Sequence, residues 1–202
     1  MIHIFKKGSK DKTLVLLHGT GGTEEDLLQI AEYLDPTANV LSFRGDVNEN
    51  GLNRFFKRLK EGVFDLEDLK YRTNKFNDLL NDLAKEYQFD RYNITAIGYS
   101  NGANLIASLL MTYKHAVKEA ILLHPMVPFR DKEIPKMPDT SVIITSGTND
   151  PIIPKKESEA LYTLLKNAEA DVTIQWYQFG HRISEDELND VKTWLSKKEI
   201  TV

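Results

Sequence analysis

The chain has 202 residues, with 26 Lys plus Arg against 30 Asp plus Glu, and 41% of its residues are hydrophobic. This composition is ordinary for one soluble globular domain, which we expect to span residues 1–202. Because the chain has no cysteine, disulfides, thiolate metal sites and cysteine nucleophiles are excluded. A formal net charge of −4 argues against nucleic-acid binding, since phosphate contacts require a basic surface.

The apolar runs are too short for a signal peptide or a membrane-spanning helix. Residues 14–17 and 120–123 are typical, against the roughly 20 residues that a bilayer requires. We therefore expect a cytoplasmic protein with no membrane partner. The sequence does not determine the oligomeric state, and a homodimer is one of the possibilities.

Seven short apolar or β-branched runs predict strands, and segments of helical periodicity alternate with most of them. The predicted strands are residues 2–5, 13–17, 40–43, 94–98, 120–123, 142–146 and 172–177. Several lack polar alternation, which indicates strands that are covered on both faces. The sequence thus predicts an α/β protein with a mostly parallel sheet of about seven strands, helices on both faces and no large lid.

Start signals mark the predicted helices. Helices are expected after Thr23 and after Asp65, each followed by a stripe of apolar residues. The helix after Asn101 is apolar on most sides and should be the most buried. Another helix is expected around residues 161–168, and Ser184 with Glu187 forms a capping box that opens the last one.

Residues 98–102 read Gly-Tyr-Ser-Asn-Gly, between a predicted apolar strand and an apolar helix. In a Gly-x-Ser-x-Gly turn of this kind, the serine hydroxyl stands above the sheet on a sharp, strained bend. Ser100 is therefore a candidate nucleophile. The alternative interpretation is that Gly98 and Gly102 only end a strand and begin a helix, with Ser100 as an ordinary cap.

A serine nucleophile needs a base and a group that orients the base. Asp150 and His181 each follow a predicted strand, as Ser100 does. Asp before Pro also starts turns, and His181 taken alone could be a solvated loop residue. However, the chain order Ser, Asp, His at successive strand ends is that of a hydrolase triad, which favours a catalytic interpretation.

Residues 18–22 read His-Gly-Thr-Gly-Gly and connect a predicted strand to a helix. This segment matches neither Gly-Lys-Ser/Thr nor Gly-x-Gly-x-x-Gly, so we interpret it as an oxyanion loop and not as a phosphate loop. The backbone amides of Thr20 and Asn101 are the predicted donors, and Gly21 is the alternative to Thr20. His18 is expected to brace the loop.

With these motifs, the chain resembles the α/β-hydrolase superfamily, and within it the small carboxylesterase/phospholipase group related to acyl-protein thioesterases and dienelactone hydrolase. The resemblance covers about residues 12–195 and depends on segments 17–19, 98–102, 147–154 and 180–181. Segments 44–45, 50–51, 54–56 and 61–65 are similar to the bacterial MhqD-like carboxylesterase branch. Dienelactone hydrolase carries cysteine where this chain has Ser100, so its substrate does not transfer.

The stretch from residue 44 to residue 64 is long for a connection and should overhang the site. Phe55 and Phe56 are candidates for a substrate pocket, or else for packing anchors. Met126, Val127 and Phe129 are candidates for the opposite wall, with packing again the alternative. His124 is expected to be structural.

We expect a serine carboxylesterase that hydrolyses a small-molecule ester through an acyl-enzyme on Ser100, with His181 as base and Asp150 as its orienting acid. No His, Asp or Glu cluster has metal-ligand spacing in the sequence, so neither a metal nor a cofactor is expected. The alternatives are an acyl thioesterase and a catalytically retired hydrolase that binds small molecules or partners.

Overall fold

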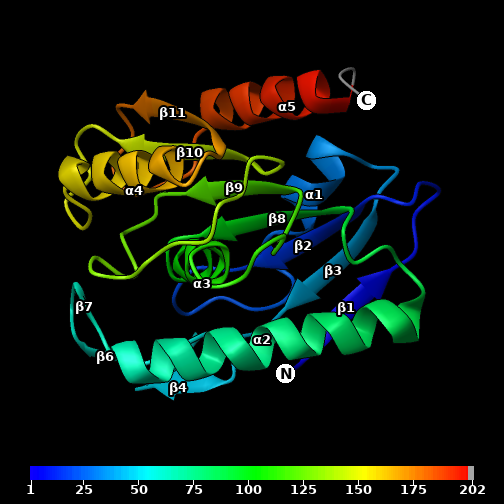
Figure 1. Ribbon diagram of the computed structural model, residues 1–202, viewed down its shortest axis with the longest axis horizontal. Helices are drawn as coiled ribbons and strands as arrows, with labels where there is room; N and C mark the ends of the chain where they lie inside the picture. Colours follow the sequence, from blue (N-terminus) through cyan, green and yellow to red (C-terminus); the bar gives the residue numbers. More distant parts are fainter. Residues whose placement is uncertain (200–202) are drawn as a thin grey trace.

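The computed structural model describes residues 1–199 and is built around one seven-stranded sheet (Figure 1). Its strands are β1 (His3–Lys6), β2 (Thr13–Leu17), β3 (Asn39–Phe43), β8 (Ile94–Tyr99), β9 (Glu119–Leu123), β10 (Ser141–Gly147) and β11 (Asp171–Tyr177). They lie in the order β1-β3-β2-β8-β9-β10-β11, with β1 antiparallel to β3 and the remaining neighbours parallel. The predicted α/β class is confirmed, and the seven predicted strands match to within one residue at each end.

Helices cover both faces of the sheet (Figure 1). One face packs against α1 (Leu28–Leu34) and α5 (Glu185–Glu199), and the other against α2 (Leu66–Tyr87), α3 (Asn101–Leu110) and α4 (Lys155–Asn167). Successive side chains of β2 enter the two cores alternately: Leu14 and Leu16 face α1 and α5, while Val15 and Leu17 face the other layer. This two-sided burial explains why the strand sequences show no polar alternation.

Two small hairpins occupy the connection between β3 and α2. The first pairs β4 (Val47–Glu49) with β5 (Leu52–Arg54), and the second pairs β6 (Arg58–Lys60) with β7 (Val63–Phe64). The sequence analysis treats this stretch as a long connection and misses both. The first hairpin turns at Asn50 and Gly51, which both have positive φ, so the Asn-Gly dipeptide was the available signal.

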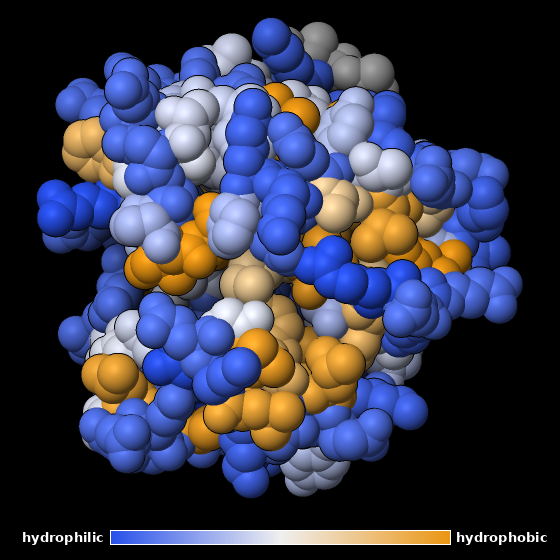
Figure 2. Space-filling view, turned by 90° about the vertical axis from the view of Figure 1, so that its left-hand side faces the viewer, coloured by the Kyte–Doolittle hydropathy of each residue, from blue (hydrophilic) through white to orange (hydrophobic). Residues whose placement is uncertain are grey.

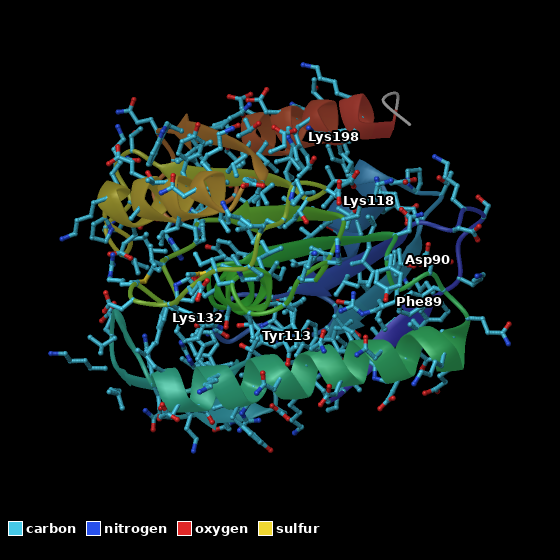
Figure 3. All side chains as sticks on the ribbon, in the orientation of Figure 1. Phe89, Asp90, Tyr113, Lys118, Lys132 and Lys198 are labelled. Carbon is cyan, nitrogen blue, oxygen red and sulfur yellow. The ribbon has the colours of Figure 1, made fainter. Side chains whose placement is uncertain are left out.

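Polar contacts fix both ends of the last helix. Ser184 and Glu187 form the predicted capping box, in which each backbone amide donates to the other side chain at 3.2 Å. At the far end Lys198, labelled in Figure 3, pairs with Asp171 at the start of β11. This ion pair lowers the pKa of Asp171.

Within residues 1–199, the helices are too short or too polar to cross a bilayer.

Asp65 opens the long helix α2, as the sequence predicts, and its carboxylate accepts a hydrogen bond from the Asp68 amide at 3.1 Å. Replacing Asp65 by Ala leaves this amide unpaired, so the free energy of unfolding should fall by about 1 kcal/mol. Urea denaturation measures the change. The Asp65→Ser variant retains a capping oxygen and should lose much less, and equal losses in both variants would show that the cap contributes little.

Candidate active site

The candidate residues gather where four neighbouring parallel strands end. Ser100 follows β8, His124 follows β9, Asp150 lies just beyond β10, and His181 lies beyond β11. Because parallel strands bring their carboxyl ends to one edge of a sheet, residues far apart in the sequence meet there. Figure 2 shows this side of the molecule, where hydrophobic side chains border a hollow.

The backbone at Ser100 is strained, with φ 50° and ψ −108°. Such positive-φ conformations are costly for a non-glycine residue and persist only where the surroundings enforce them. The two flanking glycines permit the tight packing: a Cβ on Gly102 would lie 2.1 Å from the Leu17 carbonyl oxygen, and one on Gly98 would lie 2.6 Å from the Ala103 nitrogen. The predicted strand-turn-helix geometry of this motif is therefore present.

Ser100, His181 and Asp150 form a continuous hydrogen-bonded chain. His181 Nε2 lies 3.0 Å from Ser100 Oγ, and His181 Nδ1 lies 2.7 Å from Asp150 Oδ2. The other oxygen of Asp150 accepts hydrogen bonds from the amides of Ile152 and Ile153. Burial tends to raise the pKa of Asp150, but these amides and His181 outweigh it and lower the pKa. Asp150 is thus held as a carboxylate that faces the imidazole.

Tyr99 holds the loop that carries His181. Its hydroxyl donates to the His181 carbonyl oxygen, and the two rings lie 5.5 Å apart. Burial raises the pKa of Tyr99, so the hydroxyl stays protonated and able to donate. The imidazole of His181 is therefore fixed from its backbone as well as from Asp150.

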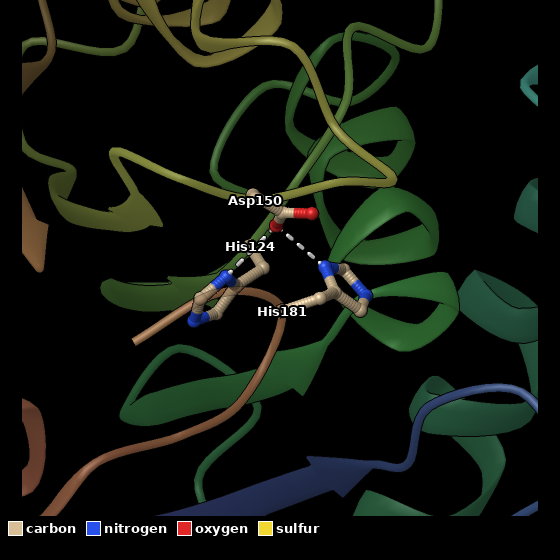
Figure 4. Close-up of side chains that lie close together, drawn as sticks. All are labelled: His124, Asp150 and His181. Carbon is tan, nitrogen blue, oxygen red and sulfur yellow. Dashed lines mark hydrogen bonds and ion pairs between the residues drawn. The ribbon is translucent and has the colours of Figure 1, made fainter. Parts of the chain in front are cut away.

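His124 is buried directly beside Asp150, a position that the sequence analysis did not anticipate (Figure 4). Its Nδ1 lies 3.3 Å from Asp150 Oδ2, and its Nε2 lies 3.4 Å from Glu187 Oε2. Burial opposes protonation, but the hydrogen bonds and charges of Glu187 and Asp150 prevail and raise the pKa of His124. The signal available in the sequence was its place immediately after a strand, between the strands of Ser100 and Asp150 in the sheet.

The nitrogen and oxygen atoms of His124, Asp150 and His181 lie within 4.8 Å of one another. Two imidazoles and a carboxylate are a common ligand set for divalent metals. No sequence motif marks the group because its members come from three separate loops. In this structure the shared Asp150 oxygen instead bridges the two imidazoles (Figure 4).

The backbone amides of the predicted oxyanion loop differ in their hydrogen bonding. Among residues 1–199, the Thr20 and Asn101 amides have no protein hydrogen-bond acceptor, whereas the Gly21 amide donates to the Asn53 carbonyl at 2.8 Å. The Gly21 amide is therefore already paired with a protein acceptor. The free amides of Thr20 and Asn101 both belong to residues that line the cavity at Ser100.

His18 braces this loop. Burial lowers the pKa of His18, which favours the neutral imidazole. Its Nε2 accepts a hydrogen bond from the Gly45 amide at 3.0 Å, so Nδ1 carries the proton and donates to the Gly19 carbonyl. The expected bracing role is thus present in the geometry.

A cavity of about 290 Å³ opens above Ser100 and is lined by Phe64, Met126, Ile152 and Ile153 as well as by polar residues. Val127 and Phe129 line an adjoining cavity of about 440 Å³, which shares Met126 and Phe64 with the first. Met126, Val127 and Phe129 therefore form cavity walls, as the sequence analysis allowed.

Phe55 and Phe56 require a correction, since both are fully buried and neither lines these two cavities. Phe55 packs against His18 at a ring distance of 4.7 Å, and Phe56 packs edge-on against Phe64 at 5.1 Å. The aromatic pair anchors the hairpin segment, residues 47–64, to the core. This packing role is the alternative that the sequence left open. Phe64 provides the aromatic wall instead.

The raised pKa of His124 predicts a pH-dependent stability. A group whose pKa is raised by folding stabilises the protein fully below its unfolded value, about 6.5, and this contribution is lost as the pH rises through the folded pKa. Between pH 6 and pH 9 the free energy of unfolding should therefore fall more in the wild type than in a His124→Gln, Glu187→Gln double variant. Urea denaturation at several pH values measures the free energy of unfolding of both proteins.

The double variant removes the imidazole together with its carboxylate, so that no new unpaired charge is buried. The exposed His115 provides the control, and His115→Gln should keep the wild-type pH dependence. Equal slopes in the wild type and the double variant would contradict the predicted role of His124.

Comparisons with known proteins identify the family of the chain. The chain matches the phospholipase/carboxylesterase family over residues 56–199. It is 48% identical over 197 residues to MhqD of Bacillus subtilis (strain 168), which is named as a hydrolase, with 98% of each chain covered. The resemblance to the MhqD-like branch is thereby confirmed.

Solved structures give the same result. The Bacillus cereus carboxylesterase is 53% identical with a TM-score of 0.95, over 96% of this chain and 93% of that one. YahD, solved with malic acid, is 34% identical with a TM-score of 0.92, over 97% of this chain and 98% of that one. The chain therefore belongs to the phospholipase/carboxylesterase family and is a hydrolase of the α/β-hydrolase fold.

Proposed function

We propose that this protein is a serine carboxylesterase that hydrolyses small carboxylic esters through an acyl-enzyme on Ser100. The observation that carries the proposal is the 3.0 Å separation between Ser100 Oγ and His181 Nε2, with His181 Nδ1 held on Asp150. A serine hydroxyl is a weak nucleophile until a positioned base accepts its proton. Here the base, its orienting carboxylate and the nucleophile are already in contact.

In the first half of the reaction, His181 accepts the Ser100 proton while Oγ attacks the ester carbonyl. Asp150 stabilises the imidazolium that forms, because its carboxylate faces Nδ1. His181 then returns the proton to the departing alcohol, and the acyl group remains on Ser100. In the second half, His181 activates a water that attacks the acyl-enzyme and releases the acid.

The negative charge of the tetrahedral intermediate is stabilised by the amides of Thr20 and Asn101. Both amides lack a protein acceptor within the described residues, and both residues line the cavity that contains Ser100. Removing one donor of this kind typically costs about 2.7 to 4 kcal/mol of transition-state stabilisation.

The cavity volumes support small substrates. The space at Ser100 measures about 290 Å³, and the adjoining cavity of about 440 Å³ widens it on the side of Met126 and Phe129. Ligand sites of this size are typical for small molecules, and the apolar walls suit acyl or aryl groups. Acyl thioesters would follow the same two steps and belong in any substrate panel.

The proposal predicts that a fluorophosphonate probe labels the folded protein and that Ser100→Ala abolishes both labelling and ester hydrolysis. Hydrolysis of 4-nitrophenyl acetate and intact-mass analysis of the labelled chain measure the two effects. A folded wild-type protein that neither reacts with the probe nor hydrolyses esters and thioesters would instead be a retired hydrolase with a binding role.

Ser100→Ala and His181→Ala should each lower kcat by about 10³-fold or more, and the double variant should lose little beyond the larger single loss. The reason is that both residues act in the same step, so that removing either one abolishes it. Steady-state kinetics of the three variants provides the test. If the two losses multiplied in the double variant, Ser100 and His181 would act independently.

A further inference from the structure

The cavity at Ser100 has a cationic side that the reaction steps above do not use. Arg54, at the end of β5, and Arg58, at the start of β6, both line this cavity. They come from the two hairpins that follow β3, so the hairpin segment faces the nucleophile with charged residues as well as with Phe64.

Arg54 is buried, with only 4% of its surface exposed, and hydrogen bonds fix its side chain in place. Its Nη1 donates to Thr20 Oγ1 at 2.7 Å, and its Nε donates to the Phe56 carbonyl oxygen at 3.2 Å. Within the described residues, its Nη2 has no hydrogen-bond acceptor. Nη2 thus remains a free donor on a residue that lines the cavity beside the predicted oxyanion loop.

Arg58 is the more accessible of the two, with 28% of its side chain exposed. It contacts Glu49 through Nε alone, at 2.8 and 3.1 Å from the two carboxylate oxygens. Its two terminal nitrogens have no protein acceptor in residues 1–199. A guanidinium with free terminal nitrogens can bind a planar carboxylate through two parallel hydrogen bonds.

The positive charge of Arg54 and Arg58 exceeds the negative charge that is ion-paired with them. Glu49 lies 3.1 Å from Arg54 Nε as well as against Arg58, so one carboxylate serves two cations. Burial and the nearby Arg58 lower the pKa of Arg54, and Glu49 opposes this lowering only in part. Glu61 also lines the cavity, but it is exposed and forms no ion pair with either arginine in the described structure.

From this arrangement we infer that the preferred esters carry a carboxylate, in the acyl or the alcohol half, which binds Arg58 and the free edge of Arg54. The two guanidiniums share Glu49 as their one ion-pair partner among the described residues, which leaves a single positive charge without an ion pair and matches a monoanion. The inference depends on the proposed ester hydrolysis and specifies its substrate class.

Two matched pairs of esters test the inference. 4-Acetoxybenzoate and its methyl ester place or remove the charge in the alcohol half, and monophenyl adipate and its methyl ester do so in the acyl half. In the wild type, kcat/KM for the charged ester of at least one pair should exceed that for its neutral partner by about tenfold or more, as expected for a charge-assisted hydrogen bond. The pair that responds identifies the half.

Arg58→Gln should bring that ratio close to one, and Arg58→Lys should give an intermediate ratio because it keeps the charge without the fork. Lys57→Gln is the matched control: it removes the same charge from the adjacent, exposed position outside the cavity and should keep the wild-type ratio. Glu61→Gln should keep or increase the ratio, since it removes a nearby negative charge.

The outcomes separate the two proposals. Hydrolysis of the neutral esters with no preference in either pair would overturn the carboxylate site and leave the esterase proposal standing. Equal loss of preference in Arg58→Gln and Lys57→Gln would also overturn it, because long-range charge would then be the cause. Absence of hydrolysis for all four esters would overturn the inference, and it would overturn the esterase proposal as well only if 4-nitrophenyl acetate and acyl thioesters also stayed intact.

Discussion

The structure depends on one close approach, that of helix α3 to strand β2 at Gly102. No side chain fits there, since a Cβ would lie 2.1 Å from the Leu17 carbonyl oxygen. The Gly102 amide instead donates to the His18 carbonyl, which ties the oxyanion loop to the helix that follows Ser100. The strained φ of Ser100 is the local cost, and the fully buried α3 over-determines it. This packing contact thus couples the turn at Ser100 to the loop of residues 18–22.

The charged groups buried at this edge of the sheet are stabilised by pairing with one another. Asp150 and Glu187 are both carboxylates shielded from solvent, and His124 lies between them. Glu187 also accepts a hydrogen bond from Thr145 and caps α5, so each of its oxygens has a partner. Buried charges are tolerated only when they are paired and hydrogen-bonded in this way. The orientation of Asp150 toward His181 therefore rests on contacts that extend into the last helix.

The strands and the Ser100, Asp150 and His181 positions could be predicted because they depend on local signals: apolar runs, glycines around a serine, and polar residues just after strands. The contacts of His124 depend on sheet order, which brings β9 between β8 and β10 and which no local pattern states. The sequence could not assign Phe55 and Phe56, because an aromatic pair occurs with the same local pattern in a core and in a pocket wall. Only the packing of the hairpin segment decided it.

The side chain of Asn101 has a mechanical consequence. Its carboxamide oxygen accepts a hydrogen bond from the Phe55 amide at 2.7 Å, while its own backbone amide has no protein acceptor within the described residues. The buried carboxamide nitrogen has no partner among the described residues, so the carboxamide joins the helix to the hairpin segment through its oxygen alone. A displacement of that segment would therefore act on the residue next to Ser100. The position of the residue beside Ser100 is thereby coupled to that of a cavity-lining segment through one side chain, without a moving domain.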